Sequence, residues 1–153
     1  VGYNVEGSEI GAAFGLQQLK KLQQNILIRK INFKRQCDFF NQHKQYFSNP
    51  VETDNINTAW LAFPILINKN VPFNRKDFQI YLEKRNIQTR VVFTGNIIRQ
   101  PMMKGQKYKT VDQGYPNSDA IMERGILLPL HHGLTDEMFK RLHKTIAEFI
   151  ENL

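Results

Sequence analysis

The segment from residue 87 to residue 101 has the residue types and spacing best suited to chemistry. Ile87 to Phe93 predicts a β-strand, because the run is largely apolar and β-branched, and Thr94-Gly95-Asn96 predicts the turn that ends it. A turn needs only glycine and asparagine, so Arg90, Arg99 and Gln100 have no structural explanation at this level. The planar guanidinium of arginine suits phosphate or carboxylate. The segment therefore predicts an anion-binding site at the end of a strand.

A second polar group, His131-His132-Gly133, follows a predicted strand at residues 126–130. Adjacent histidines point in different directions and chelate poorly, and the sequence offers no third ligand, so we predict no metal site. An anion contact or a structural turn is the expected role. We also predict no catalytic residue in this chain, since it has no Gly-rich phosphate loop, nucleophile elbow or paired carboxylates. A binding role that supports chemistry performed elsewhere fits these residues better.

The elements that must position these residues follow from hydrophobic periodicity and capping signals. The predicted helices are residues 9–22, 25–46, 75–85, 116–125 and 135–153, and the predicted strands are residues 58–67, 87–93 and 126–130. Pro64 predicts an edge position or a bulge for its strand. The pattern indicates an α+β fold: a small three-stranded, mainly antiparallel sheet with helices packed on one face. Residues 1–47 are expected to form two connector helices, and residues 48–153 a small C-terminal domain.

The composition is that of an ordinary globular protein of 153 residues, with 23% charged residues and a formal charge of +7. The basic charge favours anionic partners. The sequence has no apolar run long enough to span a bilayer, and it has no signal pattern. We therefore expect a cytoplasmic protein with no membrane partner. Cys37 is the only cysteine and is expected to be a small buried hydrophobe. The start at Val1 without a methionine suggests the C-terminal part of a longer protein, whose other domain or second subunit covers the connector helices.

Several motifs, in their order and spacing, resemble the DegT/StrS-type sugar aminotransferases over essentially the whole chain. These motifs are Gly2-Tyr3-Asn4, Ser8 to Leu22, Arg29, Asn32-Phe33, Trp60 to Pro64, Thr89-Arg90, Gly95-Asn96, Arg99-Gln100-Pro101, Asn117-Ser118-Asp119 and Leu128-Pro129-Leu130-His131. The resemblance implies the C-terminal domain of a fold-type I enzyme that uses pyridoxal phosphate and acts on nucleotide-linked keto-sugars. Phe93 to Pro101 is more similar to the NDP-4-keto-6-deoxyhexose 3-dehydratases. That branch uses pyridoxamine phosphate to remove the C3 hydroxyl and has histidine in place of the cofactor-anchoring lysine.

The resemblance also implies roles for single residues. The cofactor-anchoring residue lies before Gly2, so this chain is expected to be inactive alone and to hold no cofactor by itself. Asn4 is expected to reach the cofactor phosphate of the neighbouring subunit in a homodimer, although Glu6 stands where many aminotransferases have arginine. We also expect four residues to contact a nucleotide-diphosphate sugar or the domain interface. These residues are Arg90, Asn96, Arg99 and His131. C3 dehydration is the leading expectation and sugar transamination the alternative.

Two readings outside this family remain open from the sequence. The basic charge suits an RNA-binding module, but the aromatic residues fall at core spacing and no basic-aromatic strand motif is present, so we expect no nucleic-acid partner. The second alternative is a free-standing interaction domain, in which the apolar face of the first two helices drives self-association.

Overall fold

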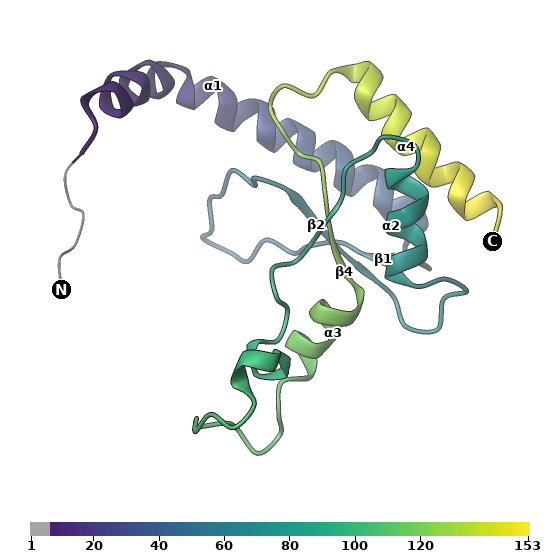
Figure 1. The fold of residues 1–153 in the computed structure, drawn as a ribbon. Coiled ribbons are helices and arrows are strands. Elements are labelled where there is room, and N and C mark those ends of the chain that lie inside the picture. Colours follow the sequence, from purple (N-terminus) through teal and green to yellow (C-terminus); the bar gives the residue numbers. More distant parts are fainter. Residues whose placement is uncertain (1–6) are drawn as a thin grey trace.

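A four-stranded antiparallel sheet lies at the centre of the computed structural model, which describes residues 7–153 (Figure 1). The strand order is β1-β2-β4-β3, with bounds Phe47–Ser48, Phe63–Ile67, Gly125–Leu128 and Arg90–Val91 respectively. The expected α+β class and the antiparallel pairing are confirmed. The expectation of three strands is wrong by one: β1 contains only two residues, which is too short for a pattern of alternating side chains to predict.

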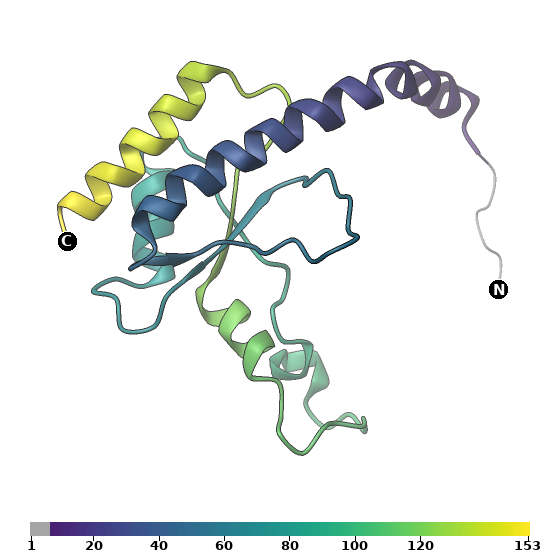
Figure 2. The same cartoon turned by 180° about the vertical axis from the view of Figure 1, so that it is seen from behind.

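Helix α1, Glu9–Phe40, is a single helix of 32 residues, so the two separate helices predicted for residues 9–46 are wrong. Its start is as expected, because the Ser8 side chain accepts a hydrogen bond from the Gly11 amide. The residues between the two predicted helices include no proline or glycine that would interrupt the backbone ladder. A short 3-10 turn, η1 (Asn41–His43), then leads into β1. The first half of α1 projects beyond the sheet, and its second half packs against it (Figure 2).

The core lies between one face of the sheet and three helices: α1, α2 (Arg75–Glu83) and α4 (Asp136–Glu151). Alternate residues of β2 point into it, as expected for a strand with one covered face. Each helix contributes large apolar side chains, and aromatic rings dominate the packing. The core residues from the strands and helices include Phe33, Phe40, Phe47, Phe63, Ile65, Ile67, Phe78, Leu82, Ile126, Leu128, Leu142 and Ile146. The prediction of helices on one face is therefore confirmed.

Pro64 lies in β2, which is an inner strand of the sheet, yet it has a strand neighbour on one side only. Strand β1 pairs with Leu66 and Ile67, whereas Pro64 pairs with Leu127 of β4. The shortness of β1 thus leaves this end of β2 with an edge, and a residue without an N–H is tolerated there. The interpretation of Pro64 as an edge residue holds locally, although the strand as a whole is internal.

The remaining helices begin where their caps predict. Asn74 accepts a hydrogen bond from the Asp77 amide at the start of α2, and Thr135 accepts one from the Met138 amide at the start of α4. Helix α3 spans Pro116–Arg124 and runs directly into β4. Two 3-10 turns, η2 (Ile97–Arg99) and η3 (Pro101–Met103), follow β3. No helix among residues 7–153 combines the length and apolar character needed to cross a membrane.

A polar relay crosses the core side of α1 and ties it to α4 and to the segment after β4. The Gln36 side chain is fully buried; its amide nitrogen donates to the Pro129 carbonyl at 3.2 Å. Its amide oxygen lies 2.8 Å from Nε2 of His143, which must therefore donate. The His143 ring also stacks on Phe39, with ring centroids 4.0 Å apart. Burial, and then the nearby positive charges of Arg35 and His43, lower the pKa of His143 from 6.5 to about 4.

This lowered pKa makes the stability of the fold depend on pH. The unfolded chain binds a proton at His143 below about 6.5, and the folded chain binds it only below about 4. The contribution of neutral His143 to the free energy of unfolding is therefore complete above pH 6.5 and declines as the pH falls from 6.5 toward 4. Urea unfolding at intervals across this range should show that decline, and His143→Gln should reduce its slope because glutamine binds no proton. An identical slope in both proteins would contradict the assignment.

Candidate functional site

The turn after β3 is held in an unusual backbone conformation by contacts with α3. Phe93 has φ 48° and Gly95 has φ 69°, and the Gly95 amide donates to the Val92 carbonyl at 3.1 Å. A bulky residue at positive φ is strained and persists only where its surroundings enforce it. At Gly95, a Cβ atom would lie 2.2 Å from Cβ of Met122 on α3. Glycine therefore allows both the turn and the close approach of α3.

Two of the predicted ligand residues link this turn to α3 by binding the same carboxylate. The buried Asn96 side chain donates to Oδ1 of Asp119 at 2.7 Å. The guanidinium of Arg99 meets the same carboxylate with both Nε and Nη2, each at 3.0 Å. The hydrogen bonds from Arg99 and Asn96 lower the pKa of Asp119, and the carboxylate in turn raises the pKa of Arg99. Both charges thus persist at neutral pH, and 59% of the Arg99 side chain is still exposed.

The other two predicted residues, Arg90 and His131, line one hollow of about 230 Å³. Its walls come from the start of β3, the end of β4 and the segment before β2. The backbone beside Arg90 is fixed, because Glu83 of α2 accepts hydrogen bonds from both the amide and the hydroxyl of Thr89, at 2.6 and 2.9 Å. Nδ1 of His131 accepts a hydrogen bond from the Gly133 amide at 3.0 Å. The neutral His131 ring therefore carries its proton on Nε2 and remains a donor.

The four predicted residues thus fall into two groups, one near each end of β4. Asn96 and Arg99 meet at α3, and Arg90 and His131 meet at the hollow; no hydrogen bond or ion pair joins the two groups within residues 7–153. Asn4, the predicted cofactor contact, lies outside the described residues. Asp119, which accepts hydrogen bonds from Asn96 and Arg99, was not predicted as their partner from the sequence. Its place in the Asn117-Ser118-Asp119 motif was the available signal, but the sequence did not link it to Arg99.

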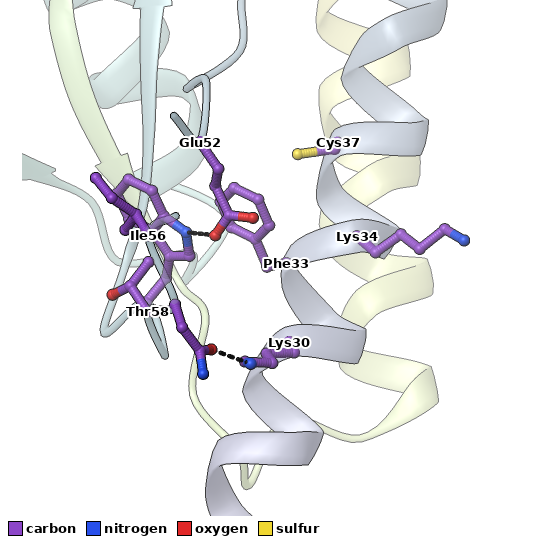
Figure 3. A pocket seen from close by; sticks show the side chains of 9 residues that line it. Lys30, Phe33, Lys34, Cys37, Glu52, Ile56 and Thr58 are labelled. Atoms are coloured by element: carbon purple, nitrogen blue, oxygen red, sulfur yellow. Dashed lines mark hydrogen bonds between the residues drawn. The ribbon is translucent and has the colours of Figure 1, made fainter. Parts of the chain in front are cut away.

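A second hollow, of about 370 Å³, lies between α1 and the segment before β2 (Figure 3). Trp60 forms one wall: its indole Nε1 donates to Glu52 at 2.7 Å, and its ring stacks on Phe33 with centroids 5.0 Å apart. Lys30 and Asn57 hold the open side together through a side-chain hydrogen bond. Burial, with the nearby Asp38 and Glu52 carboxylates, raises the pKa of Cys37 to about 11. The thiol therefore stays protonated and gives this hollow no nucleophile.

No group of three or more histidine, cysteine or acidic side chains in residues 7–153 is arranged to hold a metal ion. The chemistry that the described residues offer is instead cationic and hydrogen-bonding, and it faces outward at the two ends of β4.

Comparison with known proteins identifies the wider group to which these features belong. The sequence profile of the DegT/DnrJ/EryC1/StrS aminotransferase family matches residues 1–147. The chain belongs to this family. The dTDP-4-dehydro-2,6-dideoxy-D-glucose 3-dehydratase of Saccharopolyspora spinosa is 33% identical over 150 residues, which cover 98% of this chain and 32% of that protein. The dTDP-4-amino-4,6-dideoxy-D-glucose transaminase of Escherichia coli is 32% identical over 147 residues, covering 95% of this chain and 38% of that protein.

Among solved structures, E. coli GDP-4-keto-6-deoxy-D-mannose-3-dehydratase with bound hydrated PLP superposes with a TM-score of 0.83 at 27% identity. The superposition covers 94% of this chain and 36% of that enzyme. The chain therefore spans between 32% and 38% of the length of these members of the DegT/DnrJ/EryC1/StrS family.

The described residues do not by themselves fit a pyridoxal phosphate site. A Schiff base with this cofactor needs a lysine enclosed in a pocket with a lowered pKa. Every lysine within residues 7–153 is exposed on the surface.

The close approach at Gly95 leads to a stability prediction with an internal control. Gly95→Ala should destabilise the chain by about 2–4 kcal/mol, because it combines a positive φ with a steric clash. Gly105→Ala is the matched control: φ is 78° there, but no atom lies within 4 Å of the added Cβ. This control should cost only about 1 kcal/mol. Urea unfolding of both variants measures the difference, and equal losses would contradict the packing of α3 on the turn.

Proposed function

We propose that this chain is the C-terminal part of a cytoplasmic enzyme that uses pyridoxal or pyridoxamine phosphate and acts on nucleotide-linked 4-keto-6-deoxy sugars. The proposed reaction is dehydration at C3. The observation that carries this proposal is the 33% identity to a sugar 3-dehydratase over 98% of the chain. The superposition on a second 3-dehydratase supports it independently. The bound cofactor, when present, supplies an electron sink that allows the C3–oxygen bond to break.

A sugar aminotransferase is the second candidate function, and a specific observation favours it. The E. coli transaminase is 32% identical to this chain, so identity over this region separates the two reactions poorly. Both candidates share a nucleotide sugar as substrate and the same cofactor. They differ in their products. The dehydratase removes the oxygen at C3, whereas the transaminase adds an amino group at C3 or C4.

The residues of this chain are proposed to bind and orient rather than to transfer protons. Arg90 and the Nε2 proton of His131 both line the hollow beside β3 and suit an anionic or hydroxyl-bearing ligand. Arg99 and Asn96 hold the turn in place through Asp119, and the exposed part of Arg99 is proposed to meet the substrate or the adjoining domain. Asn4 is proposed to reach the cofactor phosphate of the neighbouring subunit. The cofactor-anchoring residue is proposed to lie outside this chain, which would leave the chain alone inactive.

We further propose that the enzyme is a homodimer and that the exposed half of α1 is covered in it by the preceding domain or the second subunit. Several large apolar residues of this half are exposed: Ile10 (84%), Phe14 (67%), Leu16 (62%) and Leu19 (62%). Apolar surface of this extent on one helix is typical of an interface. Light scattering of the full-length protein should give the mass of two subunits, and a monomer at micromolar concentration would contradict the dimer.

A product assay separates the two candidate reactions. The full-length protein, supplied with pyridoxamine phosphate and an NDP-4-keto-6-deoxyhexose, should yield a sugar that has lost its C3 oxygen, as mass spectrometry would show. Gain of an amino group at C3 or C4 would assign the transaminase reaction instead. No turnover of any nucleotide-linked keto-sugar would overturn both. Sequencing the residue at the cofactor-anchoring position adds a check, because histidine favours dehydration and lysine favours transamination.

The proposed binding roles predict kinetic losses in the full-length enzyme. Arg90→Ala and Arg99→Ala should each raise KM for the nucleotide sugar about tenfold, the order expected for one lost charge-assisted hydrogen bond. Lys84→Ala, at the exposed C-terminal end of α2, removes the same charge and is the control. Unchanged KM and kcat in the two arginine variants would remove them from the binding site.

A further inference from the structure

Helix α3 presents one face to the turn that follows β3. Asp119 and Met122 lie one turn apart on α3, so their side chains share a face of that helix. On this face, Asp119 binds Asn96 and Arg99. Met122 packs so closely against Gly95 that a Cβ atom would not fit between them. Both views of the ribbon show the short helical turns after β3 lying beside α3 (Figures 1 and 2). Asp119 is therefore the charged member of a packed contact.

The rest of the fold fixes α3, so Asp119 stands on a rigid support. The guanidinium of Arg75, on α2, donates to the Met122 carbonyl at 2.7 Å. Arg124, in the last turn of α3, donates to the Ile67 carbonyl at the end of β2. These two hydrogen bonds tie α3 to another helix and to a strand of the sheet. A carboxylate on a helix that is fixed in this way can set the direction of the groups that bind it.

The hydrogen-bonding groups of Asn96 are used within this contact. Its side-chain nitrogen donates to Oδ1 of Asp119 at 2.7 Å, and its side-chain oxygen accepts a hydrogen bond from the Ile98 amide at 3.2 Å. Only 3% of the Asn96 residue is exposed. A side chain that is buried to this extent and bound at both of its polar atoms leaves almost no surface for a ligand. Asn96 therefore belongs to the support of the Asp119 carboxylate.

The guanidinium of Arg99 is held along one edge and free along the other. Its Nε and Nη2 atoms donate to the two oxygens of Asp119, each at 3.0 Å, in the paired geometry that suits a planar guanidinium. The Nη1 group and the second N–H of Nη2 remain for other acceptors. Within residues 7–153, no other side-chain hydrogen bond or ion pair involves Arg99. The free edge is therefore available to a ligand.

The contact with Asp119 restricts Arg99 before any ligand arrives. An exposed arginine without a fixed partner samples many rotamers, and binding a ligand then costs the loss of that freedom. In this structure the carboxylate already holds the guanidinium in one orientation relative to α3. The hydrogen bonds from Arg99 and then from Asn96 lower the pKa of Asp119, so the carboxylate stays charged at neutral pH.

We propose that Asp119 is a positioning residue of the full-length enzyme, which orients Arg99 so that its free guanidinium edge meets the nucleotide-linked sugar. The identity of this ligand rests on the proposed function. Asn96 supports Asp119 and does not contact the ligand. The structure thereby separates two residues that the sequence placed in one group: Arg99 binds, and Asn96 acts through Asp119. A purely structural Asp119 would instead hold α3 to the turn and affect ligand binding only through the fold.

A double-mutant cycle in the full-length enzyme tests this role, with KM for the nucleotide sugar as the measurement. Asp119→Asn should raise KM about three- to tenfold, because an amide has one acceptor oxygen and no charge with which to hold the guanidinium. In the Arg99→Ala background the same substitution should leave KM unchanged, since no guanidinium remains to be oriented. Asn96→Ala should follow the same pattern in the two backgrounds.

The control and a second variant keep the test independent of folding losses. Asp112→Asn removes the same charge from an exposed position of the loop before α3 and should leave KM unchanged. Arg99→Lys retains the positive charge but cannot form the paired contact, so its KM should rise nearly as far as that of Arg99→Ala. Circular dichroism of each variant verifies that the fold is retained.

A measurement without substrate examines the orientation itself. In the full-length protein with isotope-labelled arginine, NMR follows the exchange of the Arg99 Nε proton with water. This proton should exchange at least about tenfold more slowly in the wild-type protein than in Asp119→Asn, because its hydrogen bond to the carboxylate protects it. Equal exchange in the two proteins would overturn the positioning role.

The kinetic outcomes separate this role from the proposed function. An equal rise of KM for Asp119→Asn with and without Arg99, or a wild-type KM in Arg99→Lys, would overturn the positioning role while turnover upheld the function. A rise of KM in Asn96→Ala that persists without Arg99 would place Asn96 against the ligand and overturn its assignment. Absence of turnover of any nucleotide sugar by the wild-type protein would overturn the proposed function and, with it, the ligand named for Arg99.

Discussion

Strand β4 is the element on which both groups of candidate residues depend. It pairs with β2 on one side and β3 on the other, and α3 runs into its first residue. The segment after its last residue carries His131 and His132 and is called the histidine segment below. At the junction with α3, a Cβ on Gly125 would lie 2.6 Å from the Ile121 carbonyl oxygen and 3.1 Å from Cγ2 of Val92. Arg75 of α2 donates to the Met122 carbonyl at 2.7 Å and thereby fixes the same junction from outside. A shift of β4 would displace both groups together.

The local elements were largely predictable from the sequence, because their signals are short-range. The capping residues Asn74 and Thr135 stand three residues before the amides they bind, and such spacing is visible in any sequence. The continuity of α1 was not predicted, although the two residues between the predicted helices, Gln23 and Gln24, do not interrupt a helix. Strand β3 was predicted too long, because the positive φ of Phe93 turns the backbone away after two paired residues. The turn that follows is held to α3 by Asn96 and Arg99, whose shared partner Asp119 is remote in sequence.

The candidate site depends on long-range pairings that no local pattern contains. Arg99 was selected because a turn does not require arginine, and that reasoning is sound, but its bidentate partner Asp119 lies 20 residues away. The arginine therefore has a structural role in addition to any role toward a ligand. Arg90 and His131 are separated along the chain by two 3-10 turns, helix α3 and strand β4, and still share one hollow. Antiparallel pairing of β3 with β4 brings them together, and the sequence predicted both strands but not their register.

Helix α1 connects its exposed first half to the segment that carries His131 and His132. Its second half is held in the core by Phe33 and Phe40, so the helix cannot rotate about its axis without disrupting the aromatic packing. On the same half, Asn32 bonds the His131 carbonyl. The exposed apolar residues of the first half continue the same rigid element. Whatever surface covers those residues therefore fixes, through one unbroken helix, the position of the histidine segment relative to itself. A site shared between this chain and an adjoining domain requires such a rigid coupling, because its two halves must meet within hydrogen-bond distance.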